Sequence, residues 1–540
     1  MRKYFTLVLI VVLAAVLRFT LLTYNPPSLN WDEISHGYNA YSISKTGMDQ
    51  WGQKFPVINF RAYGDYPTTL NLYLTIPFMV IFGLTEFAIR FPHTLLGILT
   101  VISVYFLAWG LTKRKDVSLL SAFLVAVTPW YVFTSRFVVQ SNLSVFLLTT
   151  AAAFFVNRDK NKNFKLITYS LLLLTLFSYH TTRIFSPLFL LGIALIYRKT
   201  FSWILVALFF LVTAIIYLNP NTWARSGVLS IINESAVSKI IEVRNKSNLP
   251  KIVNRFLYNR PVYFVSEFSK NYISYFFPGF LFLEGGSQYQ FSVPKTGLLY
   301  LINLPFFYLG LILLFKKEYR LLLLWLVLAP IPASLTNERL TVIRATTMLP
   351  VTEIITALGF YFLIGKISIK FRLFTTLIYI IIVMASLGFY LTRYLTNYRV
   401  NYSWSWQYGY KEAVSYTKEN YDKYDKIIVT KKYGEPHEFF LFFWPHDPVK
   451  YQNDKDKIAF YQSNWWWVDR FDKFYFVNDW QISQTESGIW KLESGEKFSC
   501  EKIKCLLITG PNNHPENWSK LETINFLDNK PAFEIYENNE

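Results

Sequence analysis

The most regular feature of the sequence is a series of apolar blocks separated by short polar joints, which ends near residue 394. Most blocks contain about 14 to 21 residues, and an α-helix needs about 20 apolar residues to cross a bilayer. The pattern therefore predicts a polytopic α-helical membrane protein with about 11 spans. The predicted spans are 4–24, 93–111, 117–135, 139–156, 166–179, 184–197, 201–218, 297–315, 321–335, 345–364 and 373–391.

Composition agrees with this pattern. The chain is 52% hydrophobic and 17% charged, whereas about a quarter of the residues in a soluble domain are charged. Its net charge of +18 comes with lysines and arginines that gather in the joints, which is typical of cytoplasmic loops rather than of nucleic-acid binding. The basic joints are 113–115, 158–165, 198–199, 316–320 and 366–372.

The basic joints also give the orientation. If the spans alternate and the N-terminus is cytoplasmic, every basic joint lies inside. Block 70–84 does not fit this count, because a span there would reverse all later joints, so we predict a helix in the outer interface. The outer segments are then 25–91, 219–296 and the tail, and the protein is a multi-pass protein of the cell membrane.

The tail, 395–540, is predicted to be a soluble extracytoplasmic α/β domain that follows a transmembrane domain of residues 1–394. It has charged helix-like runs such as 411–422, and short β-rich runs at 426–430, 474–477 and 506–509. The two cysteines, Cys500 and Cys505, both lie here, and their spacing leaves a disulfide and two free thiols equally open.

Chemistry is predicted first in the outer segment 25–91. Asp32 and Glu33 stand directly after the first span, where carboxylates beside hydrocarbon are costly and need a reason. A site is one explanation. The alternatives are a solvated loop start, or a helix that begins here with Asp32 as its N-cap.

Several further motifs occur in a fixed order after this acidic pair. Tyr63-Gly64-Asp65-Tyr66-Pro67 opens an apolar helix, and the segment 82–92 follows with Arg90. Thr128-Pro129-Trp130, Ser135-Arg136 and Gln140-Ser141-Asn142 come next. In this order the motifs resemble the GT-C membrane glycosyltransferases of the protein O-mannosyltransferase and lipid A aminoarabinose transferase type, clearly over about residues 10–200 and more weakly near 344–350.

The resemblance implies a sugar donor linked to a lipid phosphate and a catalytic aspartate in the first outer segment. Asp32 matches that aspartate and Glu33 is its usual neighbour. A base at this place takes the acceptor's proton during inverting transfer, and a carboxylate stabilises the oxocarbenium-like transition state. Arginines on the outer side should bind the phosphate of the leaving group. The alternative for each is an ordinary interface arginine whose side chain reaches the lipid headgroups. The candidates are Arg90, Arg136, Arg183 and Arg344.

Other site candidates are Asp65, Tyr66, Gln140 and His180. Asp65 and Tyr66 stand where the aminoarabinose transferases carry a Glu-Lys pair, so a phosphate contact from the lysine is missing here. Gln140 replaces an acid that the relatives usually have at the start of the fourth span, and an amide cannot act as a base or metal ligand in the same way. No cofactor is expected to be obligatory, and the need for a divalent metal is left open.

The sequence therefore predicts a hexosyl- or pentosyltransferase that moves a sugar from a polyprenyl-phosphate donor to an extracytoplasmic lipid, glycan or protein. One alternative keeps the fold but has a lipid-pyrophosphate oligosaccharide donor and a protein acceptor, as in an oligosaccharyltransferase. Another is a transporter or flippase, which predicts ionisable residues near span midplanes and inverted repeats. The run 465–467 of three tryptophans in the tail suits sugar stacking or packing, and we expect packing.

Overall fold

The computed structural model describes residues 4–161, 163–198, 201–224, 226–483 and 489–539. The chain divides into two compact units. Unit 1 contains residues Met1–Thr20 and His93–Thr392, and unit 2 contains Leu21–Pro92 and Arg393–Glu540. The predicted domain boundary at 394–395 placed residues 25–91 in the same domain as the spans. In the structure these residues belong to the same compact unit as the tail. The N-terminal residues 1–3 and Lys199 of one predicted basic joint lie outside the described residues.

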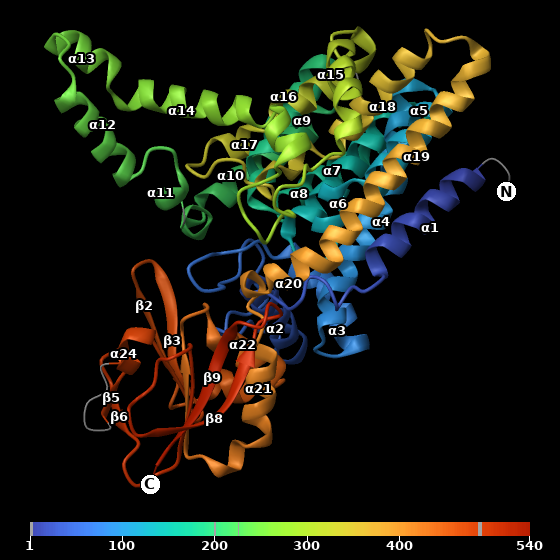
Figure 1. The fold of residues 1–540 in the computed structure, drawn as a ribbon. Coiled ribbons are helices and arrows are strands. Elements are labelled where there is room, and N and C mark those ends of the chain that lie inside the picture. Colours follow the sequence, from blue (N-terminus) through green and yellow to red (C-terminus); the bar gives the residue numbers. More distant parts are fainter. Residues whose placement is uncertain (1–3, 162, 199–200, 225, 484–488, 540) are drawn as a thin grey trace. The chain divides into compact units, whose positions relative to one another are not determined.

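Unit 1 is helical, and each predicted apolar block falls on one or more of its helices (Figure 1). The block 117–135 is divided at Thr128 because Pro129 starts a new helix at its first position. The helices that match the blocks are α1 (Phe5–Phe19), α4 (Glu86–Thr112), α5 (Lys115–Val127), α6 (Pro129–Thr134), α7 (Gln140–Val156), α8 (Asn163–Thr175), α9 (His180–Ile196), α10 (Trp203–Leu218), α15 (Leu304–Leu313), α16 (Arg320–Leu328), α17 (Ile331–Ser334), α18 (Val351–Ile364) and α19 (Ile369–Arg393).

Two helices in the described part of the chain are long and apolar enough to cross a membrane, Glu86–Thr112 and Ile369–Asn401. Seven shorter apolar helices have 10–17 residues. The helical character of the blocks is therefore confirmed, while the count of about 11 spans and their orientation stay predictions.

Small residues allow close helix packing inside unit 1. At Gly310 of α15, an added Cβ would lie 2.1 Å from the Ile355 carbonyl oxygen, and at Gly359 of α18 it would lie 1.9 Å from the Phe306 carbonyl oxygen. Glycine at these two positions lets the backbones of α15 and α18 touch directly.

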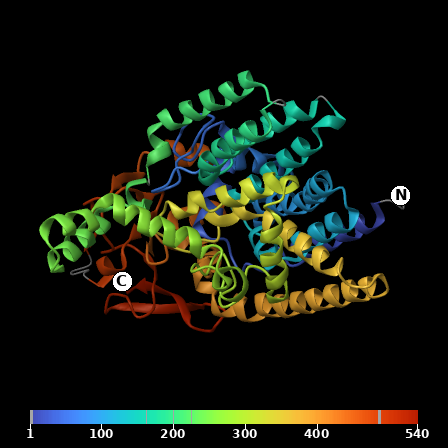
Figure 2. The same cartoon turned by 90° about the horizontal axis from the view of Figure 1, so that it is seen from above.

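The predicted outer segment 219–296 is mostly helical. It contains α11 (Ser226–Leu229), α12 (Glu234–Lys246), α13 (Lys251–Leu257) and α14 (Arg260–Ser274). Figures 1 and 2 show α12–α14, in green, extending away from the other helices of unit 1.

The tail part of unit 2 is a mixed α/β domain, as predicted. Its seven-stranded sheet has the order β2-β3-β4-β1-β7-β9-β8, in which central β1 pairs in parallel with β4 and β7 and the other pairs are antiparallel. The predicted β-rich runs are β1, β4 and β7. The strands are β1 (Lys426–Thr430), β2 (Ile458–Gln462), β3 (Trp465–Phe471), β4 (Phe474–Val477), β5 (Ile489–Lys491), β6 (Lys497–Ser499), β7 (Cys505–Thr509), β8 (Trp518–Asn525) and β9 (Pro531–Asn538).

Both faces of the sheet are covered, so β1 is buried from Ile427 to Thr430 rather than alternating. On one face, Ile428 and Tyr475 pack with Trp490 and with Cys500 and Cys505, which form a disulfide with a Cα–Cα distance of 5.9 Å. The helices of unit 2 are α2 (Trp31–Thr46), α3 (Leu70–Phe82), α20 (Arg399–Asn401), α21 (Tyr410–Glu419), α22 (Pro436–Phe443), α23 (Pro448–Asn453) and α24 (Asp479–Ser483).

The odd apolar block 70–84 forms helix α3, of 13 residues. Val80 and Ile81 near its end are 71% and 69% exposed in unit 2. Exposed apolar side chains at the end of a short helix are what a helix in the membrane interface presents to lipid. The interfacial position itself stays a prediction.

Candidate active site

The acidic pair lies in the first turn of α2, and the two carboxylates have different environments. Asn30 is the N-cap: its side-chain oxygen accepts from the Glu33 backbone N–H at 2.9 Å, and Glu33 accepts in return from the Asn30 backbone N–H at 3.3 Å. This is a capping box. The cap is therefore Asn30 and not Asp32, so the alternative that made Asp32 the helix cap is wrong. Asp32 is exposed, whereas Glu33 is fully buried.

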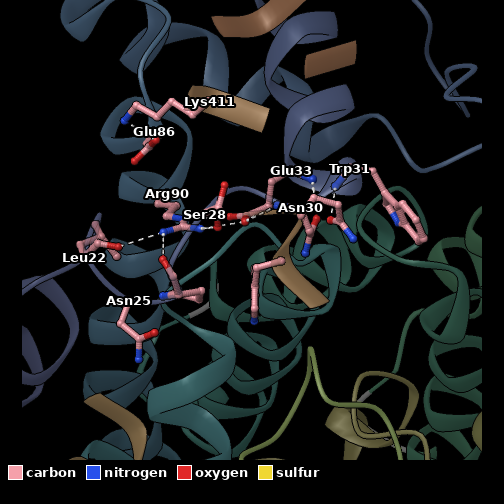
Figure 3. A network of polar contacts seen from close by, with 12 residues as sticks. Leu22, Asn25, Ser28, Asn30, Trp31, Glu33, Glu86, Arg90 and Lys411 are labelled. Atoms are coloured by element: carbon pink, nitrogen blue, oxygen red, sulfur yellow. Dashed lines mark hydrogen bonds and ion pairs between the residues drawn. The ribbon is translucent and has the colours of Figure 1, made fainter. Parts of the chain in front are cut away.

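Glu33 forms a buried ion pair with Arg90, shown in Figure 3. The Arg90 Nε donates to Glu33 Oε1 and its Nη2 donates to Glu33 Oε2, both at 2.9 Å. The remaining N–H groups of Arg90 meet the backbone carbonyls of Leu22, Pro26 and Ser28 at 3.1, 3.1 and 2.6 Å.

All five donors of the Arg90 guanidinium are thus used inside unit 2. This geometry leaves Arg90 no N–H for a lipid phosphate and leaves Glu33 no free oxygen for catalysis. The structure gives the pair a structural role, because it ties the segment before α2 to the start of α4. The prediction of donor binding by Arg90 and of a catalytic role for Glu33 finds no support here.

Asp32 accepts a hydrogen bond from the Tyr63 hydroxyl. Tyr63 is 3% exposed, and burial, followed by the charge of Asp32, raises its pKa well above its usual value. Tyr63 therefore keeps its proton and acts as a donor throughout the physiological range. Asp32 is left exposed to solvent with a fixed neighbour, which is the arrangement that a general base needs.

The neighbouring candidates Asp65 and Tyr66 are half-buried in the turn that follows Tyr63. The Asp65 side chain accepts from the backbone N–H of Tyr66 at 2.8 Å, and its backbone carbonyl accepts from Ala62 at 3.1 Å. Asp65 thus shapes the turn that carries Tyr63.

The remaining candidates belong to unit 1, and three of them are arginines. Arg136 is 2% exposed and donates to the carbonyls of Leu17, Arg18 and Thr20 at 2.7, 3.0 and 2.8 Å, so it caps the end of α1. Arg183 is equally buried, and its Nε donates to the Leu176 carbonyl at 3.0 Å.

Arg344, in the 3₁₀ turn Arg344–Met348, is the most accessible of the predicted arginines, with a side chain 19% exposed. It pairs with Glu338 at 2.8 Å and donates to the Thr336 hydroxyl at 3.1 Å. Gln140 and His180 are the first residues of α7 and α9, and both are half-buried. Of the four predicted phosphate ligands, Arg344 is the one that the structure leaves nearest to solvent.

Unit 2 also contains a buried polar cluster that no pattern in the sequence predicted. His437 lies with its ring nitrogens 3.5 Å from a Glu435 oxygen and 3.6 Å from a Glu438 oxygen, and Gln50 donates to Glu438 at 2.6 Å. Burial raises the pKa of Glu435 to about 7 and that of Glu438 to about 8.

Burial acts in the opposite direction on histidines, and it lowers the pKa of His437 to about 3 and that of His36 to about 4. Below pH 6.5 the two histidines lower the stability of the folded chain, because they take up protons when it unfolds. In that range their effect opposes that of the two carboxyls. Above that pH the carboxyls of Glu435 and Glu438 still hold protons that the unfolded chain releases, so these two groups make the stability fall as pH rises from about 6.5 to 8.

The tryptophan run is confirmed as a packing element. Trp465 stacks on Tyr63 with ring centroids 5.0 Å apart, and the Arg61 guanidinium lies 4.1 Å from the Trp466 ring centroid. Among the described residues, no group of three or more His, Cys, Asp or Glu side chains is placed to hold a metal ion. A metal requirement stays untested.

The fold and part of the sequence are similar to known proteins. Residues 8–182 match the model of the family described as dolichyl-phosphate-mannose-protein mannosyltransferase. The fold is similar to ArnT from Cupriavidus metallidurans in the apo state, with a TM-score of 0.52 and 10% identity over 100% of this chain and 98% of that chain. The chain resembles the GT-C membrane glycosyltransferases. This confirms the resemblance predicted from the motifs.

ArnT bound to undecaprenyl phosphate gives a TM-score of 0.50 and 11% identity over 98% of both chains. The Archaeoglobus fulgidus oligosaccharyltransferase in the apo form matches with a TM-score of 0.47 and 14% identity, covering 82% of this chain. The chain spans 64% of the length of that enzyme. No curated protein has a sequence that matches this chain.

Proposed function

We propose that this chain is an integral-membrane glycosyltransferase that moves a sugar from a polyprenyl-phosphate donor to an extracytoplasmic acceptor, with Asp32 as the general base. The observation that carries the proposal is the contrast within the acidic pair. Glu33 is buried against Arg90, whereas Asp32 is exposed beside a fixed hydroxyl donor. The similarity of fold to ArnT supplies the class of donor.

The chemistry follows from this placement. Asp32 takes a proton from the attacking acceptor group as that group bonds to the anomeric carbon, and the bond to the lipid-phosphate oxygen breaks with inversion. The carboxylate also stabilises positive charge that develops on the sugar ring. Arg344 is the first choice for the phosphate contact because it is more accessible than Arg90, Arg136 and Arg183. The reaction is proposed to need no obligatory metal.

The disulfide supports a tail outside the cytoplasm, because disulfides persist in oxidising compartments. With the tail outside, Asp32 in the same unit faces the outer side of the membrane.

The proposal is tested by incubating the purified chain with a panel of radiolabelled polyprenyl-phosphate sugars and a membrane extract that supplies acceptors. Loss of label from the donor and its appearance in a new product support the proposal. A parallel incubation with lipid-pyrophosphate oligosaccharides and acceptor peptides covers the alternative donor. Turnover of the pyrophosphate donors alone overturns the proposal in favour of that alternative.

A further inference from the structure

We propose that the C-terminal domain supplies a positioning residue to the active site: Trp465 of strand β3 holds Tyr63, and Tyr63 orients the carboxylate of Asp32. The inference rests on the proposed function of Asp32. It assigns the tail a part in the reaction, beyond that of a separate soluble domain.

The first contact in this chain is the hydrogen bond from the Tyr63 hydroxyl to Asp32 Oδ1. An exposed aspartate in a first helical turn can populate several rotamers, of which only some face an acceptor. The directed donor from Tyr63 selects among these rotamers. Misplacement of a reacting group by about 1 Å can cost about 10²-fold in rate, so this selection matters for turnover.

The second contact is the stack of Tyr63 on Trp465. The rings are nearly parallel, at an interplanar angle of 24° with centroids 5.0 Å apart. The backbone N–H of Trp466 donates to the Tyr63 carbonyl at 3.3 Å, so the main chain of β3 also holds this turn. Trp465 in turn donates its indole N–H to Glu435. Side chain and backbone thus fix Tyr63 from the same strand.

Gly64 shows how close this approach is. A Cβ at Gly64 would lie 1.9 Å from the Trp465 ring, which is far below any normal contact. Its backbone φ is not in the left-handed region, so the requirement for glycine here is one of space. The absence of a side chain at Gly64 therefore allows the Trp465 indole to pack directly against this turn and stack on Tyr63.

The residue on the other side of Asp32 is held by the tail as well. The Trp31 ring lies against Gly434, where an added Cβ would approach it to 2.3 Å. The Trp31 backbone N–H donates to the Gln407 side-chain oxygen at 3.3 Å. Asp32 is thus flanked by Trp31 and faced by Tyr63, and both aromatic residues rest on parts of the chain beyond residue 393.

The experiment measures kcat and donor KM of full-length variants, normalised to the fraction of each that binds donor. Tyr63→Phe removes one hydroxyl and keeps the stack, and we expect kcat to fall about 10- to 100-fold with an unchanged KM and melting temperature. Tyr461→Phe removes a hydroxyl from an exposed tyrosine of the same unit and should leave kcat unchanged.

The role of Trp465 is tested by two further comparisons. Trp465→Ala should lower kcat as much as Tyr63→Phe, and Trp465→Phe, which keeps an aromatic ring, should recover at least half of that loss on a logarithmic scale. Gly64→Ala should lower kcat as much as Trp465→Ala, because the added methyl group displaces the Trp465 ring. Gly510→Ala is the control: its methyl group contacts the flexible end of the Lys432 side chain, and kcat should not change.

The outcomes separate this inference from the proposed function. If the wild-type chain transfers sugar and Tyr63→Phe keeps the wild-type kcat, Tyr63 does not orient Asp32 and the inference fails while the function stands. Equal kcat for Trp465→Ala and wild type refutes the role of the tail. A wild-type chain that turns over none of the donors refutes the function and this inference together.

Discussion

Removing the charge of Glu33 should destabilise unit 2 strongly, because its partner Arg90 is fully buried. Glu33→Gln keeps the size and one acceptor oxygen but removes the carboxylate charge that pairs directly with the Arg90 cation. Breaking a buried ion pair from one side typically costs about 3–5 kcal/mol. The new amide also turns an N–H donor toward guanidinium donors, and the return bond to the Asn30 backbone N–H is weakened.

Glu86→Gln provides the matched control. Glu86 pairs with Lys411 at 2.8 Å, but the lysine side chain is 58% exposed, so loss of this pair should cost at most about 1 kcal/mol. For a unit of this size, about 1 kcal/mol shifts the melting temperature by roughly 2–4 °C. Glu33→Gln should therefore melt about 10 °C below wild type, and Glu86→Gln within about 4 °C of it.

The assay is thermal unfolding of detergent-purified variants at one protein concentration and pH 6.5. Arg90→Lys should be destabilised as well, because three donors cannot serve the five acceptor contacts of Arg90. A melting temperature for Glu33→Gln no lower than that of Glu86→Gln would falsify the structural role. In that case Glu33 would again be a candidate catalytic residue and Arg90 a candidate donor-binding residue.

Three further predictions concern unit 2 and the topology. The melting temperature of the wild type should fall as pH rises from about 6.5 to 8, and Glu438→Gln should flatten this slope; an unchanged slope contradicts the assignment of the proton to Glu438. Cys500→Ser should cost about 2 kcal/mol, the value for a short closed loop, and reductant should lower the wild-type melting temperature similarly; no effect of either would mean that the thiols are not bonded. In a variant without Cys500 and Cys505, a cysteine at position 115 should label only after permeabilisation and one at 480 from outside, and the reverse result would overturn the predicted orientation.

The elements of the fold could be predicted from local patterns. Apolar runs such as 139–156 and 351–364 form helices because their backbone groups must be satisfied within the segment in an apolar medium. Runs of β-branched residues such as 426–430 form strands because these side chains pack well on the pleated surface of a sheet. These signals lie within about 20 residues and need no knowledge of distant contacts.

The division into units and the roles of the arginines depend on distant contacts. Arg90 looks like an interface cation in the sequence, but its environment is set by the carbonyls of Leu22, Pro26 and Ser28, about 60 residues away. The pairing of Tyr63 with Trp465 joins segments about 400 residues apart. The sequence pattern near Tyr63 predicts a turn and an apolar helix, and it carries no sign of which residue stacks on that turn.

The same limit applies to the acidic pair. Spacing alone could not separate Asp32 from Glu33, and the resemblance to GT-C enzymes favoured Asp32 by position. The structure separates them physically, because only Glu33 is enclosed with a cation. The identity of the N-cap, Asn30, was open to a local prediction, since Asn followed three residues later by Glu is a capping-box pattern.

The most direct test of the central claim is sugar transfer by Asp32→Asn. Asparagine keeps the size of the side chain and can still accept from Tyr63, so folding and donor binding should be preserved, while the loss of the base should lower transfer by about 10²–10⁴-fold. Asp456→Asn, at a carboxylate 69% exposed in the same unit, is the control and should transfer at the wild-type rate. Transfer is measured from labelled polyprenyl-phosphate sugar by equal amounts of each folded protein. Loss of transfer in Asp32→Asn alone is the predicted result, and full transfer by that variant would contradict Asp32 as the base.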